Sequence, residues 1–422
     1  MNFERVYETP KDGNYFFGYY DKSPICKSDE KHLALKVNFF DRVPRWGDKA
    51  LIGFFEINKP NAPFQEICES NIFNWQQANM LQWYGDQSRH IFFNNLENNK
   101  YSSVLIDLSS GVRNVFDISI YDVSKDYSYA LCIDHERHHW VRRGYSYDGI
   151  CNEKKKGDIV KNDGIYKLNL HDKSIIKLID INDLINIEPV KSMTQAFHYV
   201  EHIMISPNSK RFAFLHRWKS STDDIHSRLY TCNADGTNLY LLNNSGRMSH
   251  FCWIDDQELF GWGGSSNFFS SFKKNRYLNN QILKPLKSVY KLMIKSNPVD
   301  GLDRFSSFLT GDSYMFFCDL TKNIKKVPIK IINKDGHPSC NKNHENIVLT
   351  DTYPDKNNIA SLLLYDSIKK NIIVIDELQS LPKFNNTVCR CDLHPKWSYS
   401  GNYISIDTMD SGMRSIYVYK NK

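Results

Sequence analysis

The 422-residue chain lacks the usual signals of a membrane protein or a secreted protein. No apolar run approaches the roughly 18–20 residues that cross a bilayer, and the opening Met-Asn-Phe-Glu-Arg-Val-Tyr has no signal-peptide segment. The ten cysteines are scattered without zinc-type CxxC pairs, which is typical of free thiols in a reducing compartment. We therefore expect a cytoplasmic protein with no membrane span.

The chain also has little net charge of either sign. Lys and Arg number 54 against 48 Asp and Glu, and the net charge of +6 is not gathered into basic runs. Such a mild balance is weak evidence for nucleic acid and fits an anionic small ligand equally well. We predict no nucleic-acid partner.

What the chain does contain is a repeated pattern of strand, polar turn, strand, hairpin and strand. The first two strands of this unit align at Ser206, Ile254, Asn341 and Ser398, and weaker copies begin near Ser28, Gly85 and Ser124. Seven antiparallel units of about 40–60 residues match the period of propeller blades. The sequence predicts an all-β fold, one seven-bladed β-propeller domain over residues 1–422. Residues 3–9 should close the ring as the outer strand of blade seven.

Two insertions interrupt the predicted repeat, at about 135–160 in blade three and at about 264–310 in blade five. The first is basic and polar. The second predicts an amphipathic helix, kinked at Pro285, whose apolar stripe comprises Leu278, Ile282, Leu286, Val289 and Met293. Packing on the propeller rim is the simpler interpretation, and a lid or a subunit contact in a homo-oligomer is the functional one.

Four histidines, His202, His250, His337 and His394, occupy the same position in four successive repeats. Each precedes an apolar pair on a later strand by ten and twelve residues. A single histidine at a strand start is more often a hydrogen-bonded structural residue. Equivalent positions of propeller blades converge near the ring axis, however, so four histidines in one register favour a site.

The residues around two of these histidines predict a metal centre. Asp392 and His394 stand one residue apart on a strand and should point to the same side, with His337 on the neighbouring blade completing the set. Neutral imidazole and carboxylate suit a borderline divalent ion such as Mn, Zn, Fe or Ni. We predict these three side chains as metal ligands.

Several stretches resemble one enzyme family, the oligogalacturonate lyases, which are seven-bladed propellers of the polysaccharide lyase type. The stretch from His202 to Trp262 carries the likeness through Arg228-Leu-Tyr-Thr-Cys-Asn-Ala-Asp-Gly-Thr-Asn and Ser249-His-Phe-Cys-Trp. It continues through Gly336-His337-Pro338, His394-Pro395-Lys396-Trp397 and the opening Asn14-Tyr-Phe-Phe-Gly-Tyr-Tyr-Asp-Lys. The resemblance covers most of the chain and is strongest in blades four to seven.

The family holds a divalent metal, typically manganese, with three His and one Gln. The resemblance implies His337 and His394 as two of the ligands. The last blade departs from the family pattern Gln-x-x-His-x-His, because Cys389 replaces the Gln and Asp392 replaces a His. Manganese is the expected ion, with zinc, iron, nickel and calcium as alternatives, and retention of the ion is left open.

The resemblance implies a lyase that cleaves an acidic, uronic-acid-containing oligosaccharide by β-elimination. His250 matches the catalytic His, expected to be the base, and Arg228 the catalytic Arg, expected to stabilise carboxylate or enolate, although the two roles could be exchanged. The predicted substrate contacts are His202, Lys22, Tyr20, Arg390 and His198.

Two alternative functions stay open. Hydrolysis or glycosyl transfer in surface-polysaccharide metabolism would use the same site, and the departures at Cys389 and Asp392 keep that option. A non-catalytic propeller that binds carbohydrate or protein is the other. The repeats lack the Gly-His and Trp-Asp dipeptides of WD40 blades, which disfavours the non-catalytic alternative.

Overall fold

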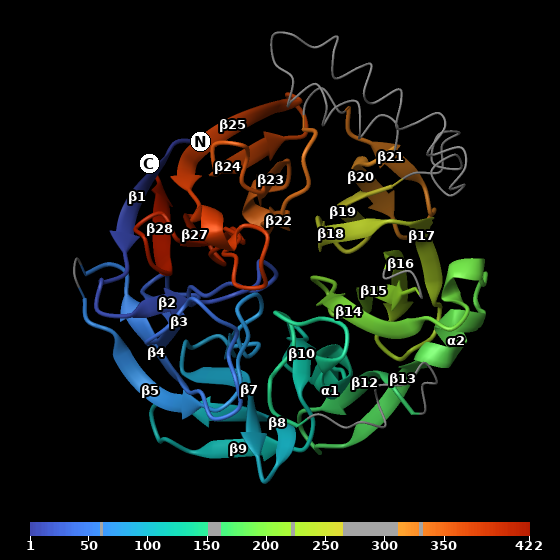
Figure 1. The fold of residues 1–422 in the computed structure, drawn as a ribbon, viewed down its shortest axis with the longest axis horizontal. Coiled ribbons are helices and arrows are strands. Elements are labelled where there is room, and N and C mark those ends of the chain that lie inside the picture. The colour runs from blue at the N-terminus through green and yellow to red at the C-terminus, as the bar shows by residue number, and fades with distance from the viewer. Residues whose placement is uncertain (60–61, 151–161, 221–223, 265–310, 329–331) are drawn as a thin grey trace.

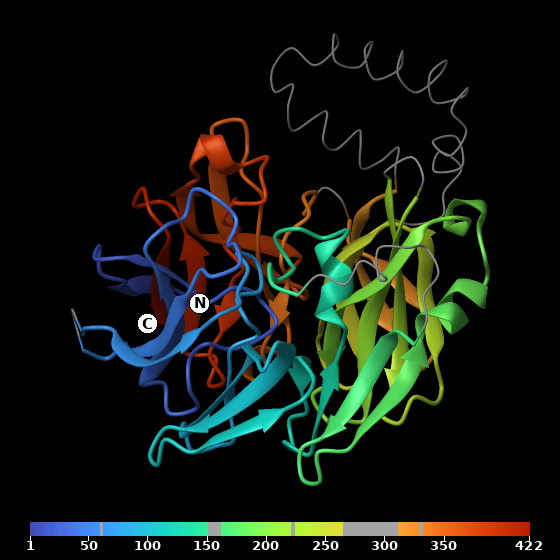
Figure 2. The same cartoon turned by 60° about the horizontal axis from the view of Figure 1, so that its bottom comes forward.

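The computed structural model describes residues 1–59, 62–150, 162–220, 224–264, 311–328 and 332–422. Within these residues, 28 strands form seven antiparallel four-stranded sheets that stand in a ring (Figure 1). Figure 2 shows the sheets of blades two, three and four side by side along that ring. The predicted all-β, seven-bladed β-propeller is confirmed.

Each blade begins at the ring axis and ends at the rim. Blade one comprises β2 (Asn14–Phe16), β3 (Lys31–Val37), β4 (Ala50–Glu56) and β5 (Gln65–Ser70); blade two comprises β6 (Gln82–Tyr84), β7 (His90–Glu97), β8 (Lys100–Asp107) and β9 (Arg113–Phe116). Blade three comprises β10 (Ile120–Val123), β11 (Tyr129–Cys132), β12 (Gly164–Asn169) and β13 (Ile175–Asp180); blade four comprises β14 (Phe197–Ile205), β15 (Arg211–Lys219), β16 (Ile225–Asn233) and β17 (Tyr240–Gly246).

The remaining blades repeat this order, and the last one is completed by the N-terminus. Blade five comprises β18 (Met248–Trp253), β19 (Glu258–Gly263), β20 (Ser313–Cys318) and β21 (Ile324–Lys326); blade six comprises β22 (Ser339–Cys340), β23 (Ile347–Asp351), β24 (Ile359–Asp366) and β25 (Asn371–Gln379). Blade seven comprises β26 (Lys396–Trp397), β27 (Tyr403–Thr408), β28 (Ser415–Asn421) and, as its outer strand, β1 (Phe3–Glu8).

The ring is closed by its two chain ends, as the sequence predicts. β1 pairs antiparallel with β28 from Phe3 opposite Asn421 to Glu8 opposite Tyr417. Both termini therefore lie in blade seven (Figure 1). The blade that carries Asp392 and His394 thus depends on hydrogen bonds between residues from opposite ends of the chain.

Short helices occupy connections between strands. α1 (His135–His139) follows β11, and α2 (Ile181–Asn186) follows β13; each has an aspartate N-cap, Asp134 or Asp180, that accepts from a backbone N–H. Within the described residues no helix is both long and apolar enough to cross a membrane. α1 lies in the predicted blade-three insertion, of which residues 135–150 are described. The helix predicted within 264–310 lies outside the described residues.

The core lies between neighbouring blades. Inner strands are buried on both faces because a blade packs on each side, and in β15 the residues from Phe212 to Trp218 are all buried. Outer strands such as β25 keep mostly partly or fully exposed positions. One apolar cluster joins residues of blades one, two and seven, and another joins blades two, three and four. This packing fixes the register of the inner strands, and so the positions of the residues that face the axis.

Candidate functional site

The four histidines in register meet at the ring axis. The ring centroids of His202 and His250 lie 5.6 Å apart, those of His250 and His337 lie 4.3 Å apart, and those of His337 and His394 lie 4.3 Å apart. All four side chains are buried. The shared register of the repeats therefore brings together residues separated by up to 192 positions in the sequence. We call these four residues the axial histidines.

A segment of blade one lies against the axial histidines. Residues 17–24 leave the inner edge of that blade between Phe16, which pairs with Leu35, and Ile25, which forms a bridge with His32. Gly18 permits this departure, since it adopts φ +102° and a Cβ there would lie 2.8 Å from the backbone of Gln77.

Tyr19, in that segment, is the aromatic centre of the site. Its ring centroid lies 5.1 Å from that of His202, 5.2 Å from that of His394, and 6.5 Å from those of His250 and His337. Its hydroxyl is hydrogen-bonded to His202 Nε2. Burial raises the pKa of Tyr19 well above its usual value, so the phenol is neutral.

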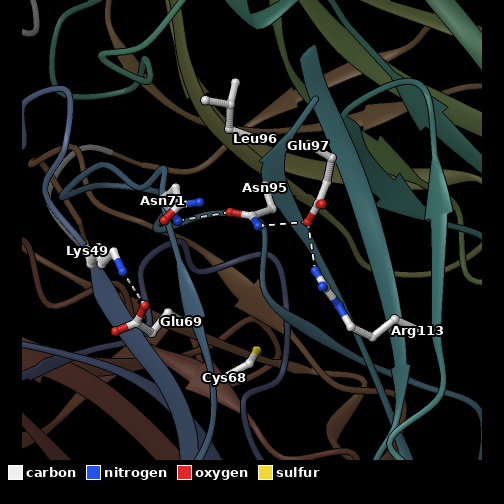
Figure 3. A pocket seen from close by; sticks show the side chains of 8 residues that line it. All are labelled: Lys49, Cys68, Glu69, Asn71, Asn95, Leu96, Glu97 and Arg113. Carbon is white, nitrogen blue, oxygen red and sulfur yellow. Dashed lines mark hydrogen bonds and ion pairs between the residues drawn. The ribbon is translucent and has the colours of Figure 1, made fainter. Parts of the chain in front are cut away.

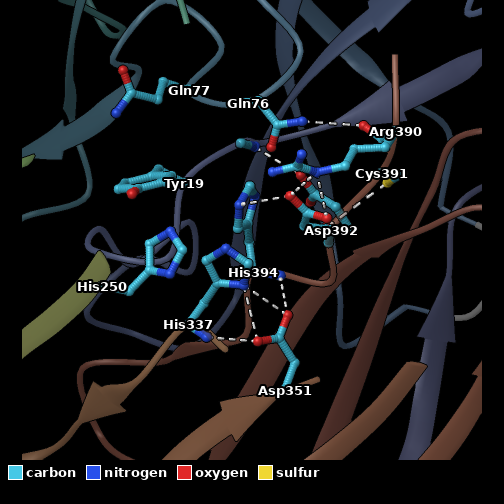
Figure 4. A network of polar contacts seen from close by, with 12 residues as sticks. Tyr19, Gln76, Gln77, His250, His337, Asp351, Arg390, Cys391, Asp392 and His394 are labelled. Atoms are coloured by element: carbon cyan, nitrogen blue, oxygen red, sulfur yellow. Dashed lines mark hydrogen bonds and ion pairs between the residues drawn. The ribbon is translucent and has the colours of Figure 1, made fainter. Parts of the chain in front are cut away.

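The predicted metal ligands converge (Figure 4). Each of His337, Asp392 and His394 offers one ligand atom, and the three atoms lie within 4.8 Å of one another. Asp351, at the end of β23, holds both histidine segments: it accepts from the His337 backbone N–H at 2.7 Å, from His337 Nδ1 at 2.9 Å and from the His394 backbone N–H at 3.3 Å. An imidazole whose Nδ1 donates to a carboxylate presents its Nε2 lone pair, as metal-bound histidines do.

These residues fit a divalent cation. The Nε2 atoms of His337 and His394 are buried and have no hydrogen-bond partner among the described residues. Burial lowers the pKa of His394 well below its usual value, whereas the Asp351 carboxylate outweighs burial and raises that of His337. Two imidazole lone pairs and a carboxylate form a set that suits Mn, Fe or Zn. Cys389, which replaces the family's glutamine, packs in the apolar cluster of blades one, two and seven.

His250 is arranged as a proton acceptor beside this set. Its Nδ1 lies 3.3 Å from Asp335 Oδ1 and 3.0 Å from Ser249 Oγ. A ring that donates from Nδ1 leaves Nε2 as the basic atom. Burial, followed by the nearby His337, lowers the pKa of His250, so the ring is neutral and able to take a proton.

A buried charge cluster adjoins His202 on the blade-four side of the site. Glu201 Oε1 lies 2.8 Å from Arg217 Nε of β15, and Oε2 accepts from Arg142 Nε at 3.2 Å. Burial alone would raise the pKa of Glu201, but the two arginines outweigh it and hold that pKa far below its usual range. Arg217 also lies 3.5 Å from the carbonyl oxygens of Met248 and Ser249, which directly precede His250. Arg217 is therefore the cation between His202 and His250.

His202 and His394 have left-handed backbone conformations, with φ of 56° and 43°. Such residues carry a conformational cost and are retained where surrounding structure holds them in place. In blade four this conformation accompanies a bulge between Glu201 and Met204. The local irregularity directs the His202 ring toward Tyr19 instead of along the sheet.

Two of the predicted substrate contacts, Tyr20 and Arg390, border the site, whereas the contacts of Lys22 among the described residues are with Asp21 and the Tyr121 ring of blade three. The Tyr20 ring centroid lies 5.8 Å from that of His250, and its hydroxyl donates to the Phe251 carbonyl at 2.9 Å. Lys22 is ion-paired with Asp21 at 2.6 Å and is only 7% exposed. Arg390 Nε donates to both oxygens of Asp392, at 3.0 and 2.8 Å. Figure 4 shows Arg390 beside the metal-ligand set, where it also orients the Asp392 carboxylate.

The structure places two other predicted residues in a separate group in blade four. Arg228 donates to the carbonyl oxygens of Ile187 at 2.8 Å and Glu188 at 2.6 Å. His198 is bonded through Nδ1 to His216 and through Nε2 to the Met193 carbonyl, both at 3.0 Å. Among the contacts recorded for the described residues, none joins either side chain to the axial histidines. The roles predicted for Arg228 and His198 stay predictions.

The sequence analysis missed three side chains of the site, because they do not share the position of the four histidines in the repeat. Arg217 lies two residues before the end of β15 and Asp351 ends β23, 15 and 14 residues after the histidine of their repeat. Asp335 lies two residues before His337. A charged residue near the end of an otherwise apolar second strand is a usable sequence signal, as in Phe-Leu-His-Arg and Val-Leu-Thr-Asp.

A hollow of about 390 Å³ lies elsewhere, between blades one and two (Figure 3). Its charged lining residues form ion pairs with one another, Lys49 with Glu69 at 2.6 Å and Arg113 with Glu97 at 2.7 Å. Because these charges are already paired, the hollow gives no reason to expect a charged ligand.

Comparison with known proteins finds the same fold in lyases. The chain is similar to an oligogalacturonate lyase solved in complex with manganese, with a TM-score of 0.62 and 13% identity over 100% of this chain and 93% of that chain. The oligogalacturonate lyase of Vibrio parahaemolyticus gives a TM-score of 0.59 and 12% identity over 99% and 96%. The tricorn protease gives 0.51 and 11%, over 97% of this chain and 34% of that one.

No protein-family model matches the sequence, and no curated protein matches it. The predicted resemblance to the oligogalacturonate lyases is confirmed at the level of the fold. Because a protease contains the same fold, the activity has to be argued from the site.

Proposed function

We propose that this protein is a metal-dependent lyase that cleaves a uronic-acid-containing glycan by β-elimination. One observation carries the proposal. The Nε2 atoms of His337 and His394, which have no hydrogen-bond partner among the described residues, lie with Asp392 in one ligand set, beside the neutral, Asp335-bonded His250. A cation site next to a base is what removal of a proton α to a carboxylate requires.

In the proposed reaction His250 is the base. Its Nε2 takes the C5 proton of the uronate, the C4–O bond breaks, the C4–C5 double bond forms, and the departing oxygen takes a proton from water. The hydroxide left behind then takes the proton from the His250 imidazolium, which restores the base. Asp335 stabilises the imidazolium through Nδ1 at 3.3 Å. The depressed pKa of His250 keeps the base unprotonated at neutral pH.

We assign the charge-stabilising role to Arg217, in place of the Arg228 expected from the sequence. Arg217 lies against Glu201, the residue before His202, and against the carbonyls that precede His250. A fixed guanidinium in a water-poor site stabilises the charge that develops on the uronate carboxylate as the proton leaves. Glu201 holds it in place, since its Oε1 lies 2.8 Å from Arg217 Nε.

His337, His394 and Asp392 would hold the divalent ion. When bound, it would act as a Lewis acid that neutralises the substrate carboxylate and so acidifies the C5 proton. Manganese is the proposed ion, in keeping with the ligand types. Asp351 and Arg390 orient the ligands from behind, through His337 Nδ1 and the Asp392 carboxylate.

The test is to incubate the metal-loaded protein with a panel of uronate oligosaccharides and follow the ultraviolet absorbance of the unsaturated product. We expect absorbance to rise with wild type, and to be lost after chelation and in His250→Ala. Mass spectrometry separates the alternatives, since hydrolysis adds water to the products and elimination does not. Bound metal and bound sugar without an unsaturated product on any uronate would refute the proposal.

A further inference from the structure

The insertion of blade three reaches the site at His202. His138 Nε2, in α1, lies 2.9 Å from the Val200 carbonyl. Further along, the Gly144 carbonyl accepts from the Gln76 backbone N–H at 3.4 Å. The Tyr145 ring lies 6.3 Å from that of His202 and 6.2 Å from that of Tyr19. The segment 134–147, which we call the roof, thus contacts residues from blades one, two and four.

Arg142 is the cation that the roof brings to the site. Its Nε donates to Glu201 at 3.2 Å, and its guanidinium carbon lies 4.1 Å from the centroid of the Tyr145 ring. Its side chain is 21% exposed, whereas that of Arg217, on the same carboxylate, is 8% exposed. Of the two arginines on Glu201, Arg142 is the more accessible.

The two sides of the site differ in what they can bind. The predicted metal ligands belong to blades six and seven, whereas Arg142 reaches the site at Glu201 and His202 of blade four. Tyr145 contacts His202 and supports Arg142 through a cation–π contact. A guanidinium has five donors, so Nε can stay on Glu201 while the terminal nitrogens bind a second carboxylate.

We propose that Arg142 is a specificity-determining residue that binds the carboxylate of a second uronate, adjacent in the glycan to the one that reacts. Tyr145 is its positioning residue. The inference rests on the proposed function for the nature of the glycan. It adds that two neighbouring acidic sugars are recognised, one at the metal-ligand side and one beneath the roof.

The experiment compares two probes by calorimetry: digalacturonate, with two carboxylates, and galacturonate, with one. Binding is measured on manganese-loaded protein in a His250→Ala background, so that neither probe is consumed. We expect Arg142→Met to weaken digalacturonate binding about tenfold to hundredfold, the value of a hydrogen bond between charged groups. Galacturonate binding should change less than about twofold, since its single carboxylate goes to the metal-ligand side.

Matched variants separate recognition from folding. Arg143→Met alters the exposed neighbour on the same segment and should leave both affinities unchanged. Arg142→Lys keeps a positive charge beside Glu201 but lacks the planar guanidinium that binds a carboxylate through two donors. We therefore expect an intermediate loss of affinity for digalacturonate and none for galacturonate. This variant replaces Arg142→Met if the latter does not fold. Tyr145→Phe should bind as wild type, and Tyr145→Leu should lose the cation–π support and bind digalacturonate more weakly.

The inference is overturned if Arg142→Met and Arg142→Lys bind digalacturonate as tightly as the parent, or if they weaken both probes equally. Its failure differs from failure of the proposed function. Arg142-dependent binding without unsaturated product refutes the elimination reaction alone. Elimination that proceeds with an unchanged KM for digalacturonate in Arg142→Met refutes the inference alone.

Discussion

Two groups of buried histidines can be compared, the axial histidines and the pair His198–His216 of blade four. They differ in how their ring nitrogens are hydrogen-bonded. The axial histidines and the pair His198–His216 are equally buried, and burial lowers the pKa of His198, His216, His202 and His250 alike. His198, however, has partners on both ring nitrogens, whereas His216 bonds to it through Nε2 and has no partner on Nδ1 among the described residues. In the axial group the Nε2 atoms of His337 and His394 have none among the described residues.

The difference shows that burial and a shifted pKa do not identify a functional histidine. Both follow from packing alone, as in His198, where the ring stacks on Trp218 at 6.2 Å. A ring nitrogen without a hydrogen-bond partner is not enough either, because His216 has one among the described residues. The predicted ligands are distinguished by Nε2 atoms that converge with the Asp392 carboxylate. The two arginines differ in position, since both contact backbone carbonyls. Arg217 pairs with Glu201 and contacts the carbonyls that precede His250, whereas Arg228 donates to the carbonyls of Ile187 and Glu188.

The sharpest test of this contrast is a pair of alanine variants. His250→Ala should lower kcat on a uronate substrate by about 10²–10⁴-fold, because general-base catalysis contributes that much. His198→Ala removes an equally buried ring and should lower the melting temperature while leaving kcat of the folded fraction within a few-fold. Steady-state kinetics measures kcat and thermal melts measure the melting temperature. An equal loss of kcat in the two variants would contradict the assignment of His250 as the base and His198 as a structural residue.

The arginines offer the next largest effect. Arg217→Met should lower kcat by about 10²–10³-fold, the value of a preorganised charge-stabilising donor. Arg228→Met should act on stability, since its guanidinium caps the Ile187 and Glu188 carbonyls. If the larger kcat loss falls on Arg228, the role predicted from the sequence is correct and our assignment is wrong.

Metal affinity tests the ligand side of the site. Asp351→Asn should weaken manganese binding about 10–100-fold, because a carboxylate behind a ligand imidazole has that effect. Asp319→Asn is the matched control, a buried aspartate bonded to Arg211 and Thr231 on the outer part of blades four and five. Competition with a fluorescent chelator reports both affinities without any turnover. Equal affinities in the two variants would contradict the role of Asp351.

The smallest expected effect is a pH dependence of stability that both imidazole groups share. Burial depresses the folded pKa of five of these histidines, His198, His216, His202, His250 and His394, whereas that of His337 is raised. The five outweigh the one, so below the ordinary histidine pKa of about 6.5 the unfolded chain binds more protons than the folded one. The free energy of unfolding should therefore fall as pH drops from about 7.5 to 5.5. His198→Gln should flatten that slope, and His171→Gln, at an exposed position, should not. Urea melts at several pH values measure it, and a slope of opposite sign would refute the argument.

The sequence predicts the ring and the axial histidines because both depend on one regular property, the register of repeated strands. A strand that is buried on both faces cannot slip without exposing Phe212 or Ile404, so the histidine ahead of each apolar pair is carried to the axis. Strand closure by β1 follows in the same way, because the chain ends on a third strand that needs a partner.

The rest of the site depends on segments that leave the repeat. No periodic signal shows that residues 17–24 depart from blade one, or that the roof places Arg142 on Glu201. Arg228 misleads for a related reason. It lies on β16, a third strand, one strand farther from the axis than Arg217 on β15, and its long side chain follows the nearest backbone carbonyls.

The departure of residues 17–24 from blade one joins parts of the ring that are not neighbours. The Tyr20 hydroxyl is anchored to Phe251 of blade five, and the Lys22 ammonium lies 5.7 Å from the Tyr121 ring of blade three. The Tyr19 ring contacts the axial histidines of blades four, five, six and seven. A displacement of this one segment would therefore reach all four imidazoles at once, although it belongs to none of their blades.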